Sequence, residues 1–431
     1  MSLDAATGMR APAFHRLRGW LAAPAAPWTR GDWLAVAAAA VLVLARWPIR
    51  ARTLLSWDSH TFAIALTDYD VNGLHPHAPG YPVYVALGRL AHLFLPDPSD
   101  AYTLLSILCV AVAAPLVYAL GRSLAGRAVG FGATALLLAA PLVHVHSLTA
   151  NVYAADLACS VAVAWAAWHV RRSPSPRRLA GLAILFALAI GVRPSLAMFL
   201  APVVAWATLR PPWALREQAR RLAAPVALGA AVCLAWFIPM VQASGGYALW
   251  KRANDLQSDQ VVFADAVWRR GLGMLQVNLD RLGLYLRWET AFVLPALLAC
   301  AVVLAALVFL RRRTETPGML ATPAAPPGLS PAPREAAWFL ALWGVPPLLF
   351  YLLVYSGYAN GPSGYALVLL PPLFLASCWL VCAGARRVLT DGRARAAFLA
   401  LALAVPAAAM TQHLEEIEAV GFRDHVSWAA S

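Results

Sequence analysis

The chain has 431 residues, of which 61% are hydrophobic and only 13% are charged, and its mean hydropathy is +0.64. Soluble domains carry about 25% charged and 45–50% apolar residues, so a water-soluble globular protein, a disordered chain and a fibrous repeat are excluded. A polytopic membrane protein is the class that fits. The formal net charge of +13 is typical of nucleic-acid-binding proteins, but the placement of the arginines argues against a nucleic-acid partner.

Apolar runs recur along the chain. A bilayer core of about 30 Å takes about 20 helical residues to cross, and we predict eleven such spans and an all-α fold. In chain order the spans cover 32–49, 101–120, 128–145, 151–170, 178–192, 194–209, 222–243, 290–310, 336–355, 365–384 and 396–410.

A twelfth apolar segment, 79–95, is short and contains Arg89 and His92. Cytoplasmic loops of membrane proteins are rich in Lys and Arg. If 79–95 does not cross, most arginines fall on the inside, whereas if it crosses, every later arginine cluster moves outside. We therefore predict a juxtamembrane helix at the outer interface, a cytoplasmic N-terminus without a cleaved signal peptide, and an extracytoplasmic C-terminus.

Large polar segments occur on the predicted outer side, so we expect the chemistry there. The inner loops are short and basic, apart from a Pro-rich loop with the composition of a linker. The predicted regions are the basic N-terminus 1–31, the core 32–210 with its first outer loop 50–100, the spans of 211–310 with outer loop 244–289, the cytoplasmic loop 311–335, and 336–431 with the last spans and an outer tail.

The six cysteines all fall inside apolar runs, where cysteine behaves as a small hydrophobic residue. Their spacing fits neither a zinc site nor a disulfide framework. The sequence therefore predicts no required cofactor, and it leaves a divalent metal open.

Asp58 is the strongest candidate for a catalytic residue. It follows the first predicted span within Trp57-Asp58-Ser59-His60, and Trp57 would anchor it at the membrane interface. A carboxylate held beside an apolar surface is a candidate general base. The alternative is that Asp58 caps the next helix, because Asp is a favoured N-cap residue. The residues themselves support both interpretations equally.

Basic side chains on the outer side are candidates to bind an anionic headgroup or phosphate. His75 and His77 lie in a Pro-rich stretch that predicts a stiff loop, with a tight re-entry turn as the alternative. Arg193 lies between two apolar runs with almost no loop, where an arginine is costly and indicates function. Its guanidinium suits phosphate, and the alternative is snorkelling to the surface. Lys251 and Arg252 are weaker phosphate candidates.

Other polar and aromatic side chains on the outer side are candidates to line the pocket or to contact an acceptor. They are Trp57, His60, Tyr81, His146, Asn151, Tyr153, Tyr358 and Tyr365.

Several motifs together resemble the GT-C integral-membrane glycosyltransferases, most closely the bacterial relatives of protein O-mannosyltransferases. The similarity is clear over about residues 50–210 and faint afterwards. Three positions depart from the family pattern, because Ala78, Asn151 and Gly364 stand where relatives usually have proline, an acid and arginine, and this leaves the substrate open. The motifs are Trp57-Asp58-Ser59-His60, His77-Ala78-Pro79-Gly80-Tyr81-Pro82, Leu104-Leu105-Ser106, Tyr118-Ala119-Leu120-Gly121-Arg122, Ser147-Leu148-Thr149-Ala150-Asn151-Val152-Tyr153-Ala154, and Gly364-Tyr365 with Leu369-Leu370-Pro371-Pro372.

The resemblance implies a GT-C fold and a polyprenyl-phosphate-linked sugar donor, used on the outer face of the bacterial cytoplasmic membrane. The acceptor would be a hydroxyl of a protein, a lipid or a glycan. Asp58 matches the family's catalytic acid and would act as general base in an inverting displacement, with arginine and histidine stabilising the leaving phosphate.

Two other functions stay open. A transporter of lipid-linked substrates would carry charged residues at mid-span and often internal repeats, and the sequence shows neither. A non-catalytic protein of envelope assembly is compatible with the departures from the family pattern.

Overall fold

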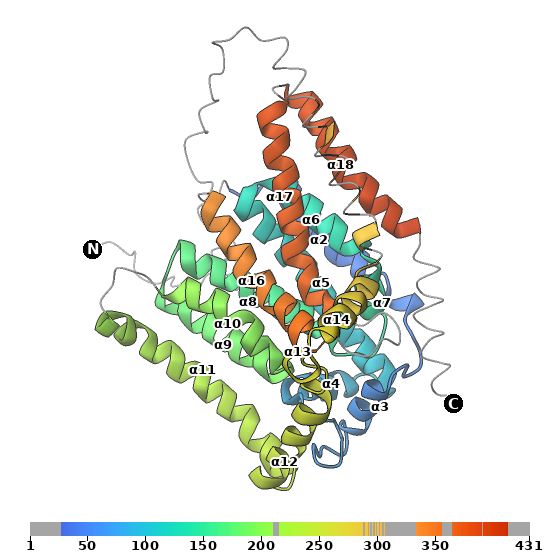
Figure 1. Cartoon of the computed structure of the whole chain (residues 1–431), viewed down its shortest axis with the longest axis vertical. Coiled ribbons are helices and arrows are strands. Elements are labelled where there is room, and N and C mark those ends of the chain that lie inside the picture. The colour runs from blue at the N-terminus through green and yellow to red at the C-terminus, as the bar shows by residue number, and fades with distance from the viewer. Residues whose placement is uncertain are drawn as a thin grey trace, which may run out of the picture.

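The computed structural model of the chain is a bundle of helices (Figure 1). It describes residues 27–209, 215–287, 333–355, 364–389 and 391–412, together with scattered residues between 289 and 306. Within these ranges the regular elements are helical, and β-pairing is limited to an isolated antiparallel bridge between Asp70 and His75. The predicted all-α fold is confirmed.

The helices follow the apolar runs closely. In chain order they are α2 (Arg30–Leu44), η1 (Trp47–Ile49), α3 (Trp57–Ile64), α4 (Pro82–His92), α5 (Pro98–Ala125), α6 (Arg127–Ala139), α7 (Pro141–Ser147), α8 (Tyr153–Arg172), α9 (Pro176–Val192), α10 (Ser195–Thr208), α11 (Leu215–Ala243), α12 (Tyr247–Gln257), η2 (Ser258–Val262), α13 (Val267–Arg270), α14 (Gly273–Tyr285), α16 (Pro333–Leu353), η3 (Gly364–Leu369), α17 (Leu370–Val388) and α18 (Gly392–Gln412).

Among the described residues, five helical segments are long and apolar enough to cross a membrane, and the pair α6 and α7 is a sixth candidate. The count of eleven spans stays a prediction, because the predicted span 290–310 lies largely outside the described residues and α10 has only 14 residues. The five segments are Arg30–Ile49, Pro98–Ala125, Arg216–Ala243, Arg334–Leu353 and Gly364–Arg386.

The run 128–145, which we predicted as one span, is divided between two helices. α6 ends at Ala139, α7 begins at Pro141, and the two axes meet at 62°. Proline lacks an N–H and clashes with the preceding turn, and it forces the residue before it into extended backbone. Ala140 has that conformation, with φ −63° and ψ 121°. The bend therefore follows from one residue that hydropathy does not distinguish.

Helix α4 has 11 residues, which span about 16 Å at 1.5 Å per residue and are too few to cross a bilayer. It buries Tyr84, Val85 and Gly88 against the bundle, and it exposes Leu87 and Leu90 on the other side. This one-sided character agrees with the predicted juxtamembrane helix.

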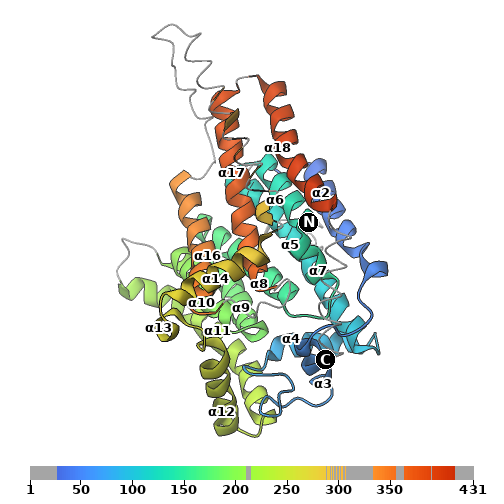
Figure 2. The same ribbon diagram turned by 45° about the vertical axis from the view of Figure 1, so that its right-hand side comes forward.

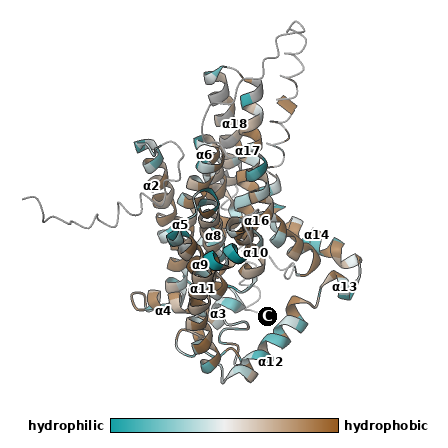
Figure 3. Cartoon of the chain, turned by 90° about the vertical axis from the view of Figure 1, so that its left-hand side faces the viewer, coloured by the Kyte–Doolittle hydropathy of each residue, from teal (hydrophilic) through white to brown (hydrophobic). Residues whose placement is uncertain are grey.

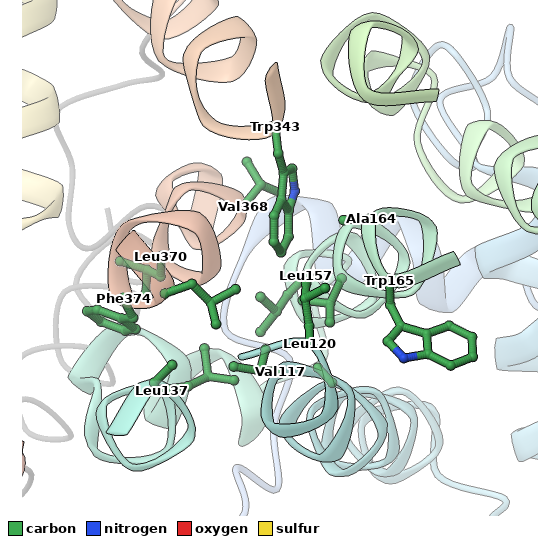
Figure 4. Packing of buried hydrophobic residues seen from close by; sticks show 14 of the residues in the cluster. Val117, Leu120, Leu137, Leu157, Ala164, Trp165, Trp343, Val368, Leu370 and Phe374 are labelled. Atoms are coloured by element: carbon green, nitrogen blue, oxygen red, sulfur yellow. The ribbon is translucent and has the colours of Figure 1, made fainter. Parts of the chain in front are cut away.

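The core lies where α5, α6, α8, α16 and α17 meet, around Leu120, Leu137, Leu157, Trp343 and Phe374 (Figure 4). Outside this core, many outward-facing helix surfaces are apolar as well (Figure 3). A protein that is apolar both inside and outside is suited to a lipid surrounding.

Helices α5 and α6 pack at backbone distance. A Cβ added at Gly121 would lie 2.8 Å from the Cα of Gly130, and one added at Gly130 would lie 2.7 Å from the carbonyl oxygen of Tyr118. Small residues at such crossings let membrane helices approach closely.

Helices α3, α4 and α12 gather at one end of the bundle (Figures 1 and 2). The loop 65–81 lies between them and is tied to the start of α12, because the backbone N–H of Val71 donates to Ser244 Oγ at 3.3 Å and Trp250 Nε1 donates to the carbonyl of Pro79 at 3.3 Å. This end of the bundle carries most of the residues that the sequence singled out.

Candidate functional site

Asp58 lies in the first turn of α3. The N-cap of this helix is Ser56, whose Oγ accepts a hydrogen bond from the backbone N–H of Ser59 at 3.1 Å. The alternative interpretation of Asp58 as the N-cap residue is therefore wrong. Its side chain is 32% exposed, and one carboxylate oxygen faces His77. Asp58 is thus available both to a neighbouring group and to a solvent-borne or membrane-borne reactant.

The loop 65–81 is held in one shape by contacts within itself. Asp70 and His75 exchange two backbone hydrogen bonds of 2.8 Å. Gly80 has φ +114°, and a Cβ there would lie 2.7 Å from the hydroxyl of Tyr69, which donates to the carbonyl of Gly80 at 2.6 Å. Only glycine fits this position, and the loop delivers His77 and Tyr81 to the side of α3.

His77 is buried, with 6% of its surface exposed. Its Nε2 lies 3.0 Å from the hydroxyl of Tyr81, and its Nδ1 lies 3.8 Å from Oδ1 of Asp58. The ring packs against Trp57 and Phe62, with centroids 5.5 and 5.9 Å apart. Burial lowers the pKa of His77 below its ordinary value of 6.5, and the positive charge of Arg193 lowers it further, although Asp58 opposes both effects. His77 is therefore neutral at pH 7.

Arg193 is the C-cap residue of α9, and Pro194 follows at the start of α10. Its Nη1 donates to Oδ2 of Asp156 at 2.5 Å, and the two side chains are 14% and 3% exposed. The guanidinium also lies over the rings of Tyr365 and Tyr153, at 4.7 and 5.5 Å from their centroids. The alternative that Arg193 snorkels to the surface is wrong, because an acid and two aromatic rings enclose it.

Tyr81 bonds to His77 through its hydroxyl and lies within electrostatic range of both Asp58 and Arg193. Burial raises the pKa of Tyr81, the charge of Arg193 opposes this shift, and the charge of Asp58 adds to it. Both charges therefore act on the same phenol. We refer to Asp58, His77, Tyr81, Arg193 and Asp156, with the rings of Tyr153 and Tyr365, as the Asp58–Arg193 cluster.

Of three other predicted pocket residues, His146 contacts the cluster, Asn151 is buried two residues before Tyr153, and Tyr358 cannot be placed. The ring of His146 packs edge-on against Tyr153 at 5.1 Å, and Tyr153 packs edge-on against Tyr365 at 5.2 Å. Asn151 is buried just before α8. Tyr358 lies outside the described residues.

Among the described residues, no hydrogen bond, ion pair or ring contact links four of the predicted site residues to the cluster. His60 is exposed, and its ring bonds to a carbonyl of its own helix turn. His75 faces Asp68, with 3.2 Å between Nδ1 and Oδ2. Lys251 pairs with an acid one turn along α12, and Arg252 is exposed on the same helix. Their proposed roles in donor or acceptor binding stay predictions.

Asp156 and Tyr355 belong to the cluster region, but we did not predict them as site residues. Tyr355 and Tyr365 have their hydroxyls 3.4 Å apart. Asp156 did carry a signal, because an acid inside an apolar run is expensive and usually functional. In the described part of the chain, no group of three or more His, Cys, Asp or Glu side chains is arranged to hold a metal ion.

An apolar helical bundle with a charged cluster at one end defines a polytopic membrane protein, and comparison with known proteins gives its type. Residues 75–242 match the family model of dolichyl-phosphate-mannose-protein mannosyltransferases. This match covers less than half of the chain and includes His77, Asp156 and Arg193. No curated protein sequence matches the chain significantly.

The fold is similar to that of ArnT from Cupriavidus metallidurans in its crystal structure with undecaprenyl phosphate. The TM-score is 0.57 at 14% sequence identity, and the alignment covers 93% of this chain and 79% of that chain. The predicted GT-C fold is therefore confirmed, and the predicted resemblance to the mannosyltransferase family is confirmed over the matched residues.

Proposed function

We propose that this protein is an integral-membrane glycosyltransferase that moves a sugar from a polyprenyl-phosphate-linked donor to an acceptor hydroxyl. The family match and the fold shared with ArnT, which binds undecaprenyl phosphate, support this class. The observation that carries the proposal is the Asp58–Arg193 cluster, in which a partly exposed carboxylate lies beside buried His77, and a buried guanidinium is held by Asp156 and the ring of Tyr153. A base at this site suits the activation of a hydroxyl nucleophile, and a nearby cation suits the stabilisation of a phosphate leaving group.

In the proposed reaction, Asp58 accepts the proton of the acceptor hydroxyl while its oxygen attacks the anomeric carbon. The bond between that carbon and the phosphate oxygen breaks, and its electron pair leaves with the polyprenyl phosphate. Attack from the face opposite the phosphate inverts the configuration. Arg193 stabilises the charge that develops on the phosphate, and the already anionic leaving group needs no proton.

We place the cluster on the extracytoplasmic face of the bacterial cytoplasmic membrane. Helix α8 begins at Tyr153 in the cluster and runs for 20 residues, about 30 Å, so Arg171 and Arg172 lie one membrane thickness away. Since arginine-rich ends belong to the cytoplasmic side, the cluster belongs to the other side, with the N-terminus inside.

The orientation is tested by cysteine labelling. In a variant that lacks the six native cysteines, His92→Cys at the end of α4 should react with a membrane-impermeant maleimide added from outside the cell. Labelling only after the cytoplasmic side is opened to the reagent would contradict the orientation. Arg177→Cys is the control, because this exposed position at the start of α9 should show the opposite pattern.

The function is tested with protein in lipid vesicles, undecaprenyl-phosphate-linked radiolabelled hexose, pentose or amino sugar, and a membrane extract as acceptor. Asp58→Asn should lower the rate of transfer by about 10²–10⁴-fold, which is the usual weight of a general base. Asp68→Asn is the matched control, because that side chain is 71% exposed and lies outside the cluster. Transfer that survives Asp58→Asn unchanged would refute the base, and wild-type protein that transfers none of these sugars would refute the function.

A further inference from the structure

His77 has both ring nitrogens directed at named groups. Tyr81 faces Nε2 at 3.0 Å, and Asp58 faces Nδ1 at 3.8 Å. Nδ1 is buried and makes no hydrogen bond in the described part of the chain. The distance to Asp58 is slightly longer than a hydrogen bond, and catalytic hydrogen bonds often shorten only when the reactants are bound.

The ring has little freedom to turn away from Asp58. It is enclosed by Trp57 and Phe62 of α3 and by Tyr81, whose centroid lies 5.0 Å from that of His77. Tyr81 is itself fixed, because it is the N-cap residue of α4 at φ +49° and is buried. The imidazole is thus held by the two elements that border the site.

The protonation of the ring follows from its surroundings. The charged groups that act on it are Asp58 from α3 and Arg193 from the junction of α9 and α10, and burial outweighs the carboxylate, so the ring stays neutral at pH 7. A neutral imidazole has one N–H. If Tyr81 donates to Nε2, that proton lies on Nδ1 and points at Asp58, whereas the other tautomer would set a lone pair against a carboxylate.

We propose that His77 is a positioning residue: Tyr81 fixes it as the Nδ1–H tautomer, and this N–H holds one oxygen of Asp58 so that the other faces the acceptor hydroxyl. The proposal rests on Asp58 being the base of the proposed function. It also replaces the predicted role of His77 in binding the donor phosphate, since a neutral, buried imidazole whose ring nitrogens face Tyr81 and Asp58 is poorly suited to an anion.

The tautomer of His77 can be measured without an assay of sugar transfer. In protein labelled with ¹⁵N-histidine in detergent micelles, the signals lost in His77→Asn identify the ring, and their shifts should report a proton on Nδ1. Tyr81→Phe combined with Asp58→Ala, which removes both neighbours of the ring nitrogens, should move that proton to Nε2, the commoner position in water. A wild-type proton on Nε2, or a spectrum that the double variant leaves unchanged, would overturn the proposal even if sugar transfer is never observed.

Kinetics separate positioning from phosphate binding. His77→Ala should lower kcat roughly 10- to 100-fold, the weight of one hydrogen bond to a charged group, with the KM for the donor unchanged. His77→Asn, whose amide can replace Nδ1–H, should restore most of kcat.

Two patterns would contradict the positioning role. A higher KM for the donor with an unchanged kcat would indicate phosphate binding, and a loss of thermal stability with kcat and KM both unchanged would indicate packing alone. His92→Ala on α4 is the matched histidine control, and it should change none of these values.

Discussion

The buried ion pair between Arg193 and Asp156 permits a quantitative test of the site's construction. Asp156 is 3% exposed and Arg193 14% exposed, and the bond between them joins two chain segments 37 residues apart. Removing one partner of such a pair leaves a buried charge without compensation, which costs about 3–5 kcal/mol. We therefore expect Asp156→Asn and Arg193→Gln each to lower the free energy of unfolding by about that amount.

The double variant tests whether the two effects share one cause. With both charges gone, no uncompensated charge remains, so Asp156→Asn with Arg193→Gln should cost clearly less than the two single changes together. The assay is equilibrium unfolding in detergent, followed by tryptophan fluorescence, for the wild type and the three variants.

An exposed pair provides the control. Arg269 and Asp259 lie 2.7 Å apart, but their side chains are 44% and 67% exposed, and exposed pairs contribute about 0–1 kcal/mol. Asp259→Asn should therefore have little effect. If the single changes at the buried pair add within about 0.5 kcal/mol, the two side chains act independently, and the described pairing is not what holds Arg193.

Three further predictions concern close contacts and pH. Gly364→Ala should lower sugar transfer and stability, because a Cβ there would lie 2.2 Å from Cγ of Tyr153, whereas Gly283→Ala should be neutral or slightly stabilising, since its Cβ would meet nothing within 4 Å. Gly130→Ala should lower the free energy of unfolding by about 1–3 kcal/mol, because its Cβ would meet a backbone carbonyl of α5 that cannot move aside. Burial lowers the pKa of His77 below its ordinary value of 6.5. At pH values below 6.5 the unfolded chain therefore binds more protons than the folded chain, and stability falls as the pH is lowered. His77→Asn lacks this contribution, so its melting temperature should fall less between pH 7 and pH 5 than that of the wild type, and equal slopes would contradict this.

The sequence was informative about helices because a membrane requires each spanning segment to be apolar and to satisfy its own hydrogen bonds. The run 151–170 became α8, and the break at Arg193 became the junction of α9 and α10. The same pattern did not indicate the bend within 128–145, where hydropathy is uniform and Pro141 alone decides where the helix breaks. Backbone sterics and hydropathy are independent properties, and the prediction for this segment used hydropathy alone.

The site was predictable where a local motif contained it. Asp58 follows a span, and His77 and Tyr81 share one stiff loop, so their neighbourhood could be expected. The partner of Arg193 could not be predicted, because Asp156 lies on a different helix and no local sequence pattern indicates which helices are in contact. Lys251 was singled out for its charge alone, yet α12 turns it toward an exposed acid of the same helix.

The pairing of Arg193 bears on how the proposed reaction would be assisted. A flexible cation would have to reorient as charge develops on the leaving phosphate, whereas a group fixed beforehand stabilises that charge without reorganisation. Asp156 holds one guanidinium nitrogen, and the rings of Tyr153 and Tyr365 hold the guanidinium from its faces. A guanidinium has five N–H donors, so one bond to Asp156 leaves its capacity for a phosphate largely intact. In the proposed reaction, the acid that compensates Arg193 would therefore also fix the direction from which the guanidinium meets the phosphate.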